Sequence, residues 1–208
     1  METTSSDIEY EDECSIAEDK KDGIPVRKFS APYLETLAVY RKIADKMLDY
    51  DTILFHGSAV SVEGVGYLFT AKSGTGKSTH TRLWREMLGE RAVMINDDKP
   101  LIKVSEKGIT IYGTPWDGKH RLSTNTSVPL RAICILERAE ENRIVPITKK
   151  DAYNMLIQQV YKPTEPRMLI KTLQLLDRLS ENVKLYRLGC NMDIGAAEIS
   201  YKTMSENT

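Results

Sequence analysis

With 208 residues, 41% of them apolar and 28% charged, the chain has the composition of an ordinary globular protein with one full core, and a second domain is not required. The net charge is -1, but it is unevenly distributed. Residues 1–22 hold nine acidic residues and two Lys, about -7, so the remainder of the chain carries about +6. A basic remainder suits an anionic ligand. The acidic N-terminus is unlike a secretory signal, no apolar run approaches the ~20 residues of a membrane span, and three scattered Cys disfavour a disulfide framework or a zinc site.

The first part of the chain divides near residue 24. Residues 1–23 are acidic and have no hydrophobic period, which predicts a disordered leader before a single domain over residues 24–208. Order is expected from Ser30, because a Ser followed closely by Pro is a helix start signal. Apolar residues then recur every three or four positions up to Met47, which predicts an amphipathic helix of about four turns.

The rest of the chain mixes strands and helices without strict alternation. In chain order we expect strands at 52–62 and 67–71 joined as a hairpin, a helix at 77–88, a strand at 92–95, a second hairpin at 101–112, a strand at 132–136, helices at 149–160 and 165–181, a strand at 183–188 and a helix at 193–204. This order favours an α/β fold with antiparallel pieces in its sheet.

A glycine-rich segment lies between the strand at 67–71 and the helix at 77–88. That context and its sequence match the Walker A phosphate-binding loop, in which backbone N–H groups and the helix N-terminus hold phosphate oxygens. Lys77 would reach the β- and γ-phosphates, and the Ser78 hydroxyl would hold magnesium. The Walker A loop usually begins with a glycine, and Ala71 stands at that position in this chain. The expected nucleotide-binding residues are Ser73, Gly74, Thr75, Gly76, Lys77, Ser78 and Thr79.

Two adjacent carboxylates, Asp97 and Asp98, end the next apolar strand, about twenty residues after the loop. In a phosphoryl-transfer site one carboxylate can hold magnesium, and another can accept the proton of an attacking hydroxyl. A polar turn before Lys99 is the structural alternative. His56 lies within the apolar strand before the loop, where it is either a core residue or, if that strand adjoins the loop, a partner for an Asp or a phosphate.

The stretch from His56 to Ser78, with its Gly57, Gly64 and Gly66, resembles the core of HPr kinase/phosphorylase, in particular its small single-domain members. The resemblance implies a P-loop-containing, HPr-kinase-like catalytic core with a mixed sheet and flanking helices. It also implies that His56, Lys77, Ser78, Asp97 and Asp98 form the active site, with one carboxylate accepting the proton of a protein serine and with magnesium, held by Ser78 and Asp98, bridging the phosphates. Phosphoenolpyruvate carboxykinases share a similar loop and fold.

A third segment, Gly113–Arg121, packs two Gly, a Pro, a Trp and three potential cations into nine residues. Such a loop can offer a stacking face and phosphate-binding groups together, and it resembles a Pro-Trp loop of the small HPr-kinase-like proteins. We expect Trp116, Lys119 and Arg121 to contact the acceptor or the nucleotide. The alternative is a surface turn with Trp116 folded into the core.

The leading hypothesis is a cytoplasmic kinase that uses ATP or another nucleoside triphosphate and Mg²⁺. Its acceptor would be a hydroxyl, most simply a serine of a peptide or protein, or else a small molecule. A nucleotide-switched regulator without transfer activity and carboxykinase chemistry are the alternatives. We expect no nucleic-acid partner, because no basic stripe with interleaved aromatic residues is present, and no membrane partner. HPr kinases are oligomers, so the resemblance favours a homo-oligomer.

Overall fold

The computed structural model describes residues 2–118 and 120–206. It contains, in chain order, α1 (Ser5–Asp22), α2 (Ala31–Met47), a 3₁₀ turn (Leu48–Tyr50), β1 (Thr52–Leu54), β2 (Gly57–Val62), β3 (Val65–Thr70), α3 (Lys77–Leu88), a second 3₁₀ turn (Gly89–Arg91), β4 (Ala92–Asp98), β5 (Leu101–Ser105), β6 (Gly108–Tyr112), β7 (Ser127–Arg138), β8 (Arg143–Pro146), α4 (Lys149–Gln159), α5 (Pro166–Asn182), β9 (Lys184–Cys190) and α6 (Ile194–Ser205). The chain divides into two compact units, Met1–Asp49 and Tyr50–Thr208.

The first unit is a pair of helices, α1 and α2, and it corrects the prediction of a disordered leader over residues 1–23. A capping box begins α1, because the Thr4 side chain accepts from the Asp7 backbone N–H and the Asp7 carboxylate accepts from the Thr4 backbone N–H. Arg41 of α2 then bridges two turns of this acidic helix, with Nε 2.6 Å from Glu11 Oε1 and Nη2 3.3 Å from Asp7 Oδ1. Cationic partners therefore allow so acidic a segment to be helical.

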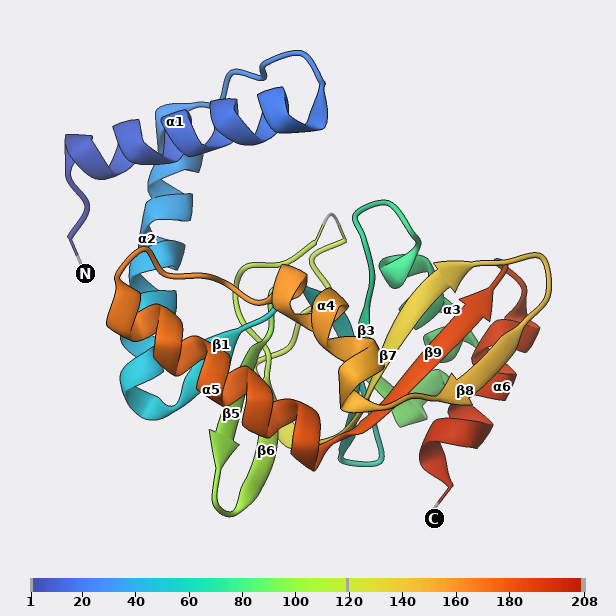
Figure 1. The fold of residues 1–208 in the computed structure, drawn as a ribbon. Helices are drawn as coiled ribbons and strands as arrows, with labels where there is room; N and C mark the ends of the chain where they lie inside the picture. The colour runs from blue at the N-terminus through green and yellow to red at the C-terminus, as the bar shows by residue number, and fades with distance from the viewer. Residues whose placement is uncertain (1, 119, 207–208) are drawn as a thin grey trace. The chain divides into compact units, whose positions relative to one another are not determined.

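The second unit is built on a mixed sheet whose strands run in the order β1-β5-β6-β7-β3-β2-β4, with β9 also paired to β7 and β8 paired to β9. Strand β7 connects the two halves of this sheet. Its first residues pair antiparallel with β6, and its remainder pairs parallel with β3 on one edge and with β9 on the other. Figure 1 shows β7 beside β9 near the middle of this unit. The predicted α/β class with a mixed sheet and flanking helices is confirmed.

Helices cover the sheet in two groups. In the first group, α3 and α6 pack on each other, α3 lies against β2, β3 and β4, and α6 lies against β8 and β9. In the second group, α5 packs against β1, β5 and β6, and α4 packs against α5 (Figure 1). The main core cluster includes Phe69, Trp84 and Met204, all fully buried. Cys134 on β7 belongs to the same cluster, as expected of a structural thiol.

The predicted elements of this unit agree closely with the observed ones. The helix expected at 77–88 is α3 with the same bounds, and both hairpins form. Four details differ: the strand expected at 52–62 is broken into β1 and β2, β4 extends three residues beyond Ile95, the strand expected at 132–136 is the longer β7, and β8 is an additional strand. Among the described residues, no helix is both long and apolar enough to cross a membrane.

Candidate functional site

The glycine-rich segment forms a tight loop between β3, which ends at Thr70, and α3, which begins at Lys77. Gly74 has φ of 74° and Gly76, the N-cap of α3, has φ of 116°, so both positions need the freedom of glycine. Ala71, in contrast, is fully buried and has no positive φ, so the glycine that usually stands there is not required. The loop leads directly into the N-terminus of a twelve-residue helix, where backbone N–H groups are available to an anion.

The Lys77 side chain is held at the base of this loop. Its Nζ donates a hydrogen bond to the Ala71 carbonyl oxygen over 3.2 Å. Burial lowers the pKa of Lys77 from its ordinary value, while the nearby carboxylates of Asp98 and Asp97 act in the opposite direction. Lys77 and the Asp pair therefore lie close enough to interact electrostatically, as the sequence predicts.

Asp97, in the last part of β4, is held by a short chain of hydrogen bonds. Its Oδ1 accepts a hydrogen bond from Ser58 Oγ over 2.6 Å, and Ser58 Oγ lies 2.8 Å from Thr81 Oγ1. Because the Ser58 proton goes to the carboxylate, Thr81 is the donor in the second contact. Asp97 is 7% exposed and Ser58 is 1% exposed, so this chain of hydrogen bonds is buried. It joins β2, β4 and α3, and no local motif marks it.

Asp98 is the accessible member of the pair, with about a third of its side chain exposed. Its Oδ1 lies 3.5 Å from His56 Nε2, and its Oδ2 lies 4.0 Å from Lys99 Nζ. Burial and then the charge of Lys77 lower the pKa of His56, and the Asp98 carboxylate only partly offsets this. His56 is therefore neutral at pH 7. Both carboxylates lie in β4, paired with β2, rather than in a polar turn.

Asn96 connects the Asp pair with the Gly113–Arg121 segment. Its fully buried side chain accepts from the backbone N–H groups of Asp98 (2.9 Å) and Lys99 (2.6 Å) through Oδ1. Its Nδ2 donates to the carbonyl oxygens of Thr114 and Trp116, both over 3.1 Å. All the hydrogen-bonding capacity of this amide is therefore spent on fixing the strand end against the loop.

The Gly113–Arg121 segment reaches Asp97 itself. A Cβ placed on Gly118 would stand 2.5 Å from the Asp97 carbonyl oxygen and 3.0 Å from Asp97 Oδ2, so only glycine fits. Asp117 accepts backbone N–H groups from Gly118 and Ser123, each over 2.8 Å. Burial alone would raise the pKa of Asp117, but these hydrogen bonds outweigh it and lower the pKa.

The three residues that we expect to contact a substrate have different surroundings. Trp116 is half-buried, and its carbonyl oxygen accepts from Asn96 Nδ2, so the residue is not folded fully into the core, and its contact with an acceptor or nucleotide stays a prediction. Arg121 is exposed and has φ of 48°, an unusual backbone conformation for a non-glycine residue. Lys119 lies outside the described residues.

The donor set for a metal is small. Among the described residues, no group of three or more His, Cys, Asp and Glu side chains is suited to hold a metal ion. Ser78 is exposed in the first turn of α3, and Asp98 is partly exposed at the end of β4. Two oxygen ligands, completed by phosphate oxygens and water, are a usual set for Mg²⁺, so the residues present fit this ion when it arrives with a nucleotide.

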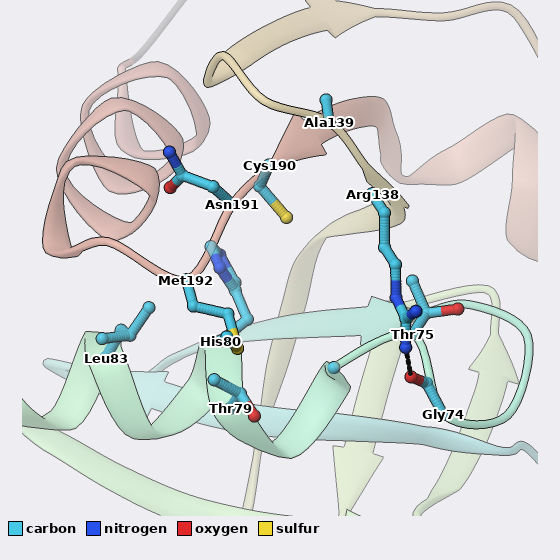
Figure 2. Close-up of a pocket in the computed structure, with 11 residues that line it drawn as sticks. Gly74, Thr75, Thr79, His80, Leu83, Arg138, Ala139, Cys190, Asn191 and Met192 are labelled. Carbon is cyan, nitrogen blue, oxygen red and sulfur yellow. Dashed lines mark hydrogen bonds between the residues drawn. The ribbon is translucent and has the colours of Figure 1, made fainter.

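One further residue supports the loop. Arg138, the last residue of β7, donates from Nη2 to the Gly74 carbonyl oxygen over 2.5 Å, as Figure 2 shows. Sequence reasoning missed it, because Arg138 lies 64 residues from Gly74 and nothing local marks the pair.

Comparisons with known proteins complete these findings. The model of the family described as SynChlorMet cassette protein ScmC matches residues 14–192. No curated protein matches the chain. Among solved structures, the Hpr(Ser) kinase/phosphatase from Coxiella burnetii is similar, with 9% identity, a TM-score of 0.39, and 74% of this chain and 99% of that chain covered. This degree of likeness carries no argument about function.

Proposed function

This chain belongs to the SynChlorMet cassette protein ScmC family, and we propose that it is a magnesium-dependent phosphotransferase. It moves the terminal phosphoryl group of a nucleoside triphosphate, which we take to be ATP, to a hydroxyl, which we take to be a serine of a peptide or protein. The proposal includes the P-loop role of residues 73–79 and the catalytic roles of His56, Lys77, Asp97 and Asp98.

The observation that carries the proposal is the convergence of a cation and two carboxylates beside a glycine-rich helix N-terminus. Lys77 begins α3, Asp97 and Asp98 end β4, and each carboxylate raises the pKa of Lys77 against the effect of burial. A loop that favours phosphate and carboxylates that suit a metal or a proton meet in one place. The sequence resemblance of residues 52–98 to HPr kinases supports the same chemistry.

In the proposed reaction, the backbone N–H groups of residues 74–78 and the Lys77 ammonium hold the phosphate chain. Magnesium, when bound with the nucleotide, offsets phosphate charge. The acceptor oxygen forms a bond to the terminal phosphorus as the bond from that phosphorus to the diphosphate leaving group breaks, and the hydroxyl proton passes to a carboxylate. Asp98 suits a direct contact with the acceptor or the metal because it is partly exposed, whereas buried Asp97 is held by Ser58. Most of the rate enhancement would come from positioning and charge.

The test is transfer of label from γ-labelled ATP, with Mg²⁺, to the small proteins and peptides encoded beside the gene, followed by mass spectrometry. We expect label on a serine, loss of transfer in Asp98→Asn, and unchanged transfer in Glu106→Gln, which neutralises an exposed carboxylate in the turn between β5 and β6. Lys77→Gln should weaken nucleotide binding, whereas Lys72→Gln, an exposed lysine of the same loop, should not.

Further measurements distinguish the two possible roles of Asp98, and a transferase from a nucleotide-switched regulator. If Asp98→Asn weakens the affinity for Mg²⁺ in the nucleotide complex, Asp98 is a metal ligand, and if that affinity is unchanged while transfer is lost, Asp98 is the proton acceptor. If the wild type binds nucleotide and no offered hydroxyl is labelled, the transferase proposal fails and a nucleotide-switched regulator takes its place.

A further inference from the structure

A hollow lies beside the glycine-rich loop and is lined by Thr79, His80 and Leu83 of α3, whereas Thr81 of the same helix contacts Ser58. Its volume is about 490 Å³, which is within the ~300–1,000 Å³ of small-molecule sites. The loop residues Gly74, Thr75 and Gly76 form one wall, and Thr79 and His80 of α3 form the floor (Figure 2). The end of β7 and the segment after β9 close the other side. A ligand bound at the loop could therefore extend into this space without a break.

His80 lines this hollow, and its side chain carries a buried polar atom that has no partner. Its side chain is 2% exposed, and Nδ1 has no hydrogen-bond partner, while Nε2 lies 3.1 Å from Ser200 Oγ. Figure 2 shows the His80 ring reaching from α3 towards the segment that holds Cys190 and Met192. Burial lowers the pKa of His80 to about 4, so the ring is neutral at pH 7 and carries one proton.

The surroundings of Ser200 determine where that proton sits. Ser200 Oγ accepts from Trp84 Nε1 over 2.8 Å, and its single proton is within reach of the Ala196 and Ala197 carbonyl oxygens, 2.8 and 3.1 Å away. With that proton on the helix carbonyls, Ser200 has one acceptor position left, and in that arrangement His80 Nε2 is the donor in the contact between them. Nδ1 of His80 is then a bare acceptor. A buried acceptor without a donor is costly, and a ligand N–H or O–H group would satisfy it.

The other walls fit an amphipathic ring system. Leu83, Ala139 and the highly exposed Met192 are apolar, and a methionine thioether packs well against the edge or face of an aromatic ring. Arg138 adds a cation at the mouth, where it already binds the Gly74 carbonyl oxygen. Apolar walls, one buried acceptor and one mouth cation, adjoining a phosphate-type loop, describe a site for a nucleoside.

We propose that this hollow holds the base and ribose of the nucleotide, with His80 Nδ1 accepting a hydrogen bond from a nucleoside hydroxyl or amino group. The inference rests on the proposed function, because the phosphates of the same nucleotide occupy the adjacent loop. The inference assigns recognition of the nucleotide, which is the phosphoryl donor, to His80, Ala139 and Met192. These residues are remote from one another in sequence and carry no base-reading motif.

Isothermal titration calorimetry with Mg²⁺ and two ligands, ADP and inorganic pyrophosphate, tests the inference on the full chain. In the wild type, ADP should bind at least about tenfold more tightly than pyrophosphate, because only ADP fills the hollow. Ala139→Trp, an exposed wall position, should abolish this difference and leave pyrophosphate binding unchanged. Asn154→Trp, which puts the same bulk into an exposed hollow between α4 and α5, is the matched control and should change neither affinity.

A separate variant tests the role of His80 Nδ1 as a hydrogen-bond acceptor. His80→Phe keeps a ring and removes the acceptor, and we expect roughly a tenfold loss of ADP affinity with pyrophosphate affinity unchanged. Two further ligands identify the group that donates to His80 in the wild type. Weaker binding of 2′-deoxy-ADP points to a ribose hydroxyl, and weaker binding of inosine diphosphate points to the amino group of the base. If both bind as tightly as ADP, the acceptor role of His80 is overturned.

The outcomes separate the two proposals. If pyrophosphate binds and ADP binds no more tightly, or if Ala139→Trp leaves the ADP advantage intact, the nucleoside site is refuted while the phosphate loop stands. If neither ligand binds the wild type, the proposed function itself fails.

Discussion

Ser58 Oγ donates to Asp97 Oδ1 over 2.6 Å while it accepts from Thr81 Oγ1, 2.8 Å away. One buried hydroxyl therefore couples the carboxylate at the end of β4 to the helix that follows the glycine-rich loop. A shift of α3 upon ligand binding would be felt at Asp97 through this contact, since both hydrogen bonds are shielded from water.

The first prediction concerns this coupling. Ser58→Ala leaves Asp97 Oδ1 without its donor in a buried place, so we expect the free energy of unfolding to fall by about 1–3 kcal/mol and transfer activity to fall by at least about tenfold. Thr81→Val keeps the Ser58–Asp97 bond and should cost less in both measurements. Urea unfolding and label transfer on the two variants check this, and equal losses in both variants would remove the special role of Ser58.

The second prediction concerns the close approach of the Gly113–Arg121 segment. Gly118→Ala should displace that segment, because the added methyl group would stand 2.5 Å from the Asp97 carbonyl oxygen. We expect activity to fall by about tenfold or more. Gly195→Ala is the control, since its added methyl group meets nothing closer than Asn142 Nδ2 at 3.7 Å and its helix should be undisturbed. Similar activities in the two variants would place the segment outside the reaction.

The third prediction concerns pH. The pKa of His80 falls from 6.5 to about 4 on folding, so between these values the unfolded chain binds a proton that the folded protein does not. Stability is therefore unaffected above about pH 6.5 and falls as the pH drops towards 4. Between pH 7 and pH 5 we expect a loss of about 2 kcal/mol from this group. Urea unfolding at both pH values should show a loss that is about 2 kcal/mol smaller in His80→Phe than in the wild type, because His56, whose pKa is also lowered, contributes equally to both.

The fourth prediction concerns the helical pair of the first unit. Arg41→Met removes the contacts with Glu11 and Asp7, and we expect amides of α1 to exchange their hydrogens roughly threefold to tenfold faster. Arg82→Met, which breaks an exposed ion pair with Glu86 on α3, should leave α1 unchanged. Hydrogen-exchange mass spectrometry gives both results. High salt should reproduce part of the Arg41→Met effect, because the ion pairs are screened.

The sequence predicted elements where the determining signals are local. The bounds of α3 follow from the glycine loop before it and Gly89 after it, and both hairpins have turn residues between alternating apolar runs. Helix α1 was missed because its composition suggested disorder. The Thr4–Asp7 capping box was readable, but the cations of α2 that support the helix lie 30 to 35 residues from their partners.

The candidate site was predictable in its chemistry and less so in its supports. Loop, lysine and Asp pair are each marked by a short motif, and the structure brings them together. Asn96, Ser58 and Arg138 carry no motif, since Asn96 meets Thr114, Ser58 meets Asp97 and Arg138 meets Gly74 across 18 to 64 residues of sequence. The bare Nδ1 of His80 depends on Ser200, 120 residues later, and no local pattern could reveal it.

The hydrogen bond from the Gly113 N–H to the Thr126 carbonyl oxygen, 3.0 Å long, closes the segment between them at its base. β7 begins just beyond, and its far end carries the arginine that holds the glycine-rich loop. In evolutionary terms, the segment between Gly113 and Thr126 and the strand that follows it can therefore change separately. A loop closed at its base tolerates insertions and deletions at its tip, because the added chain need not pass into the sheet. Under the proposed function, relatives could change the phosphoryl acceptor by changing this one loop, while the glycine-rich loop, held by the last residue of a twelve-residue strand, stays as it is.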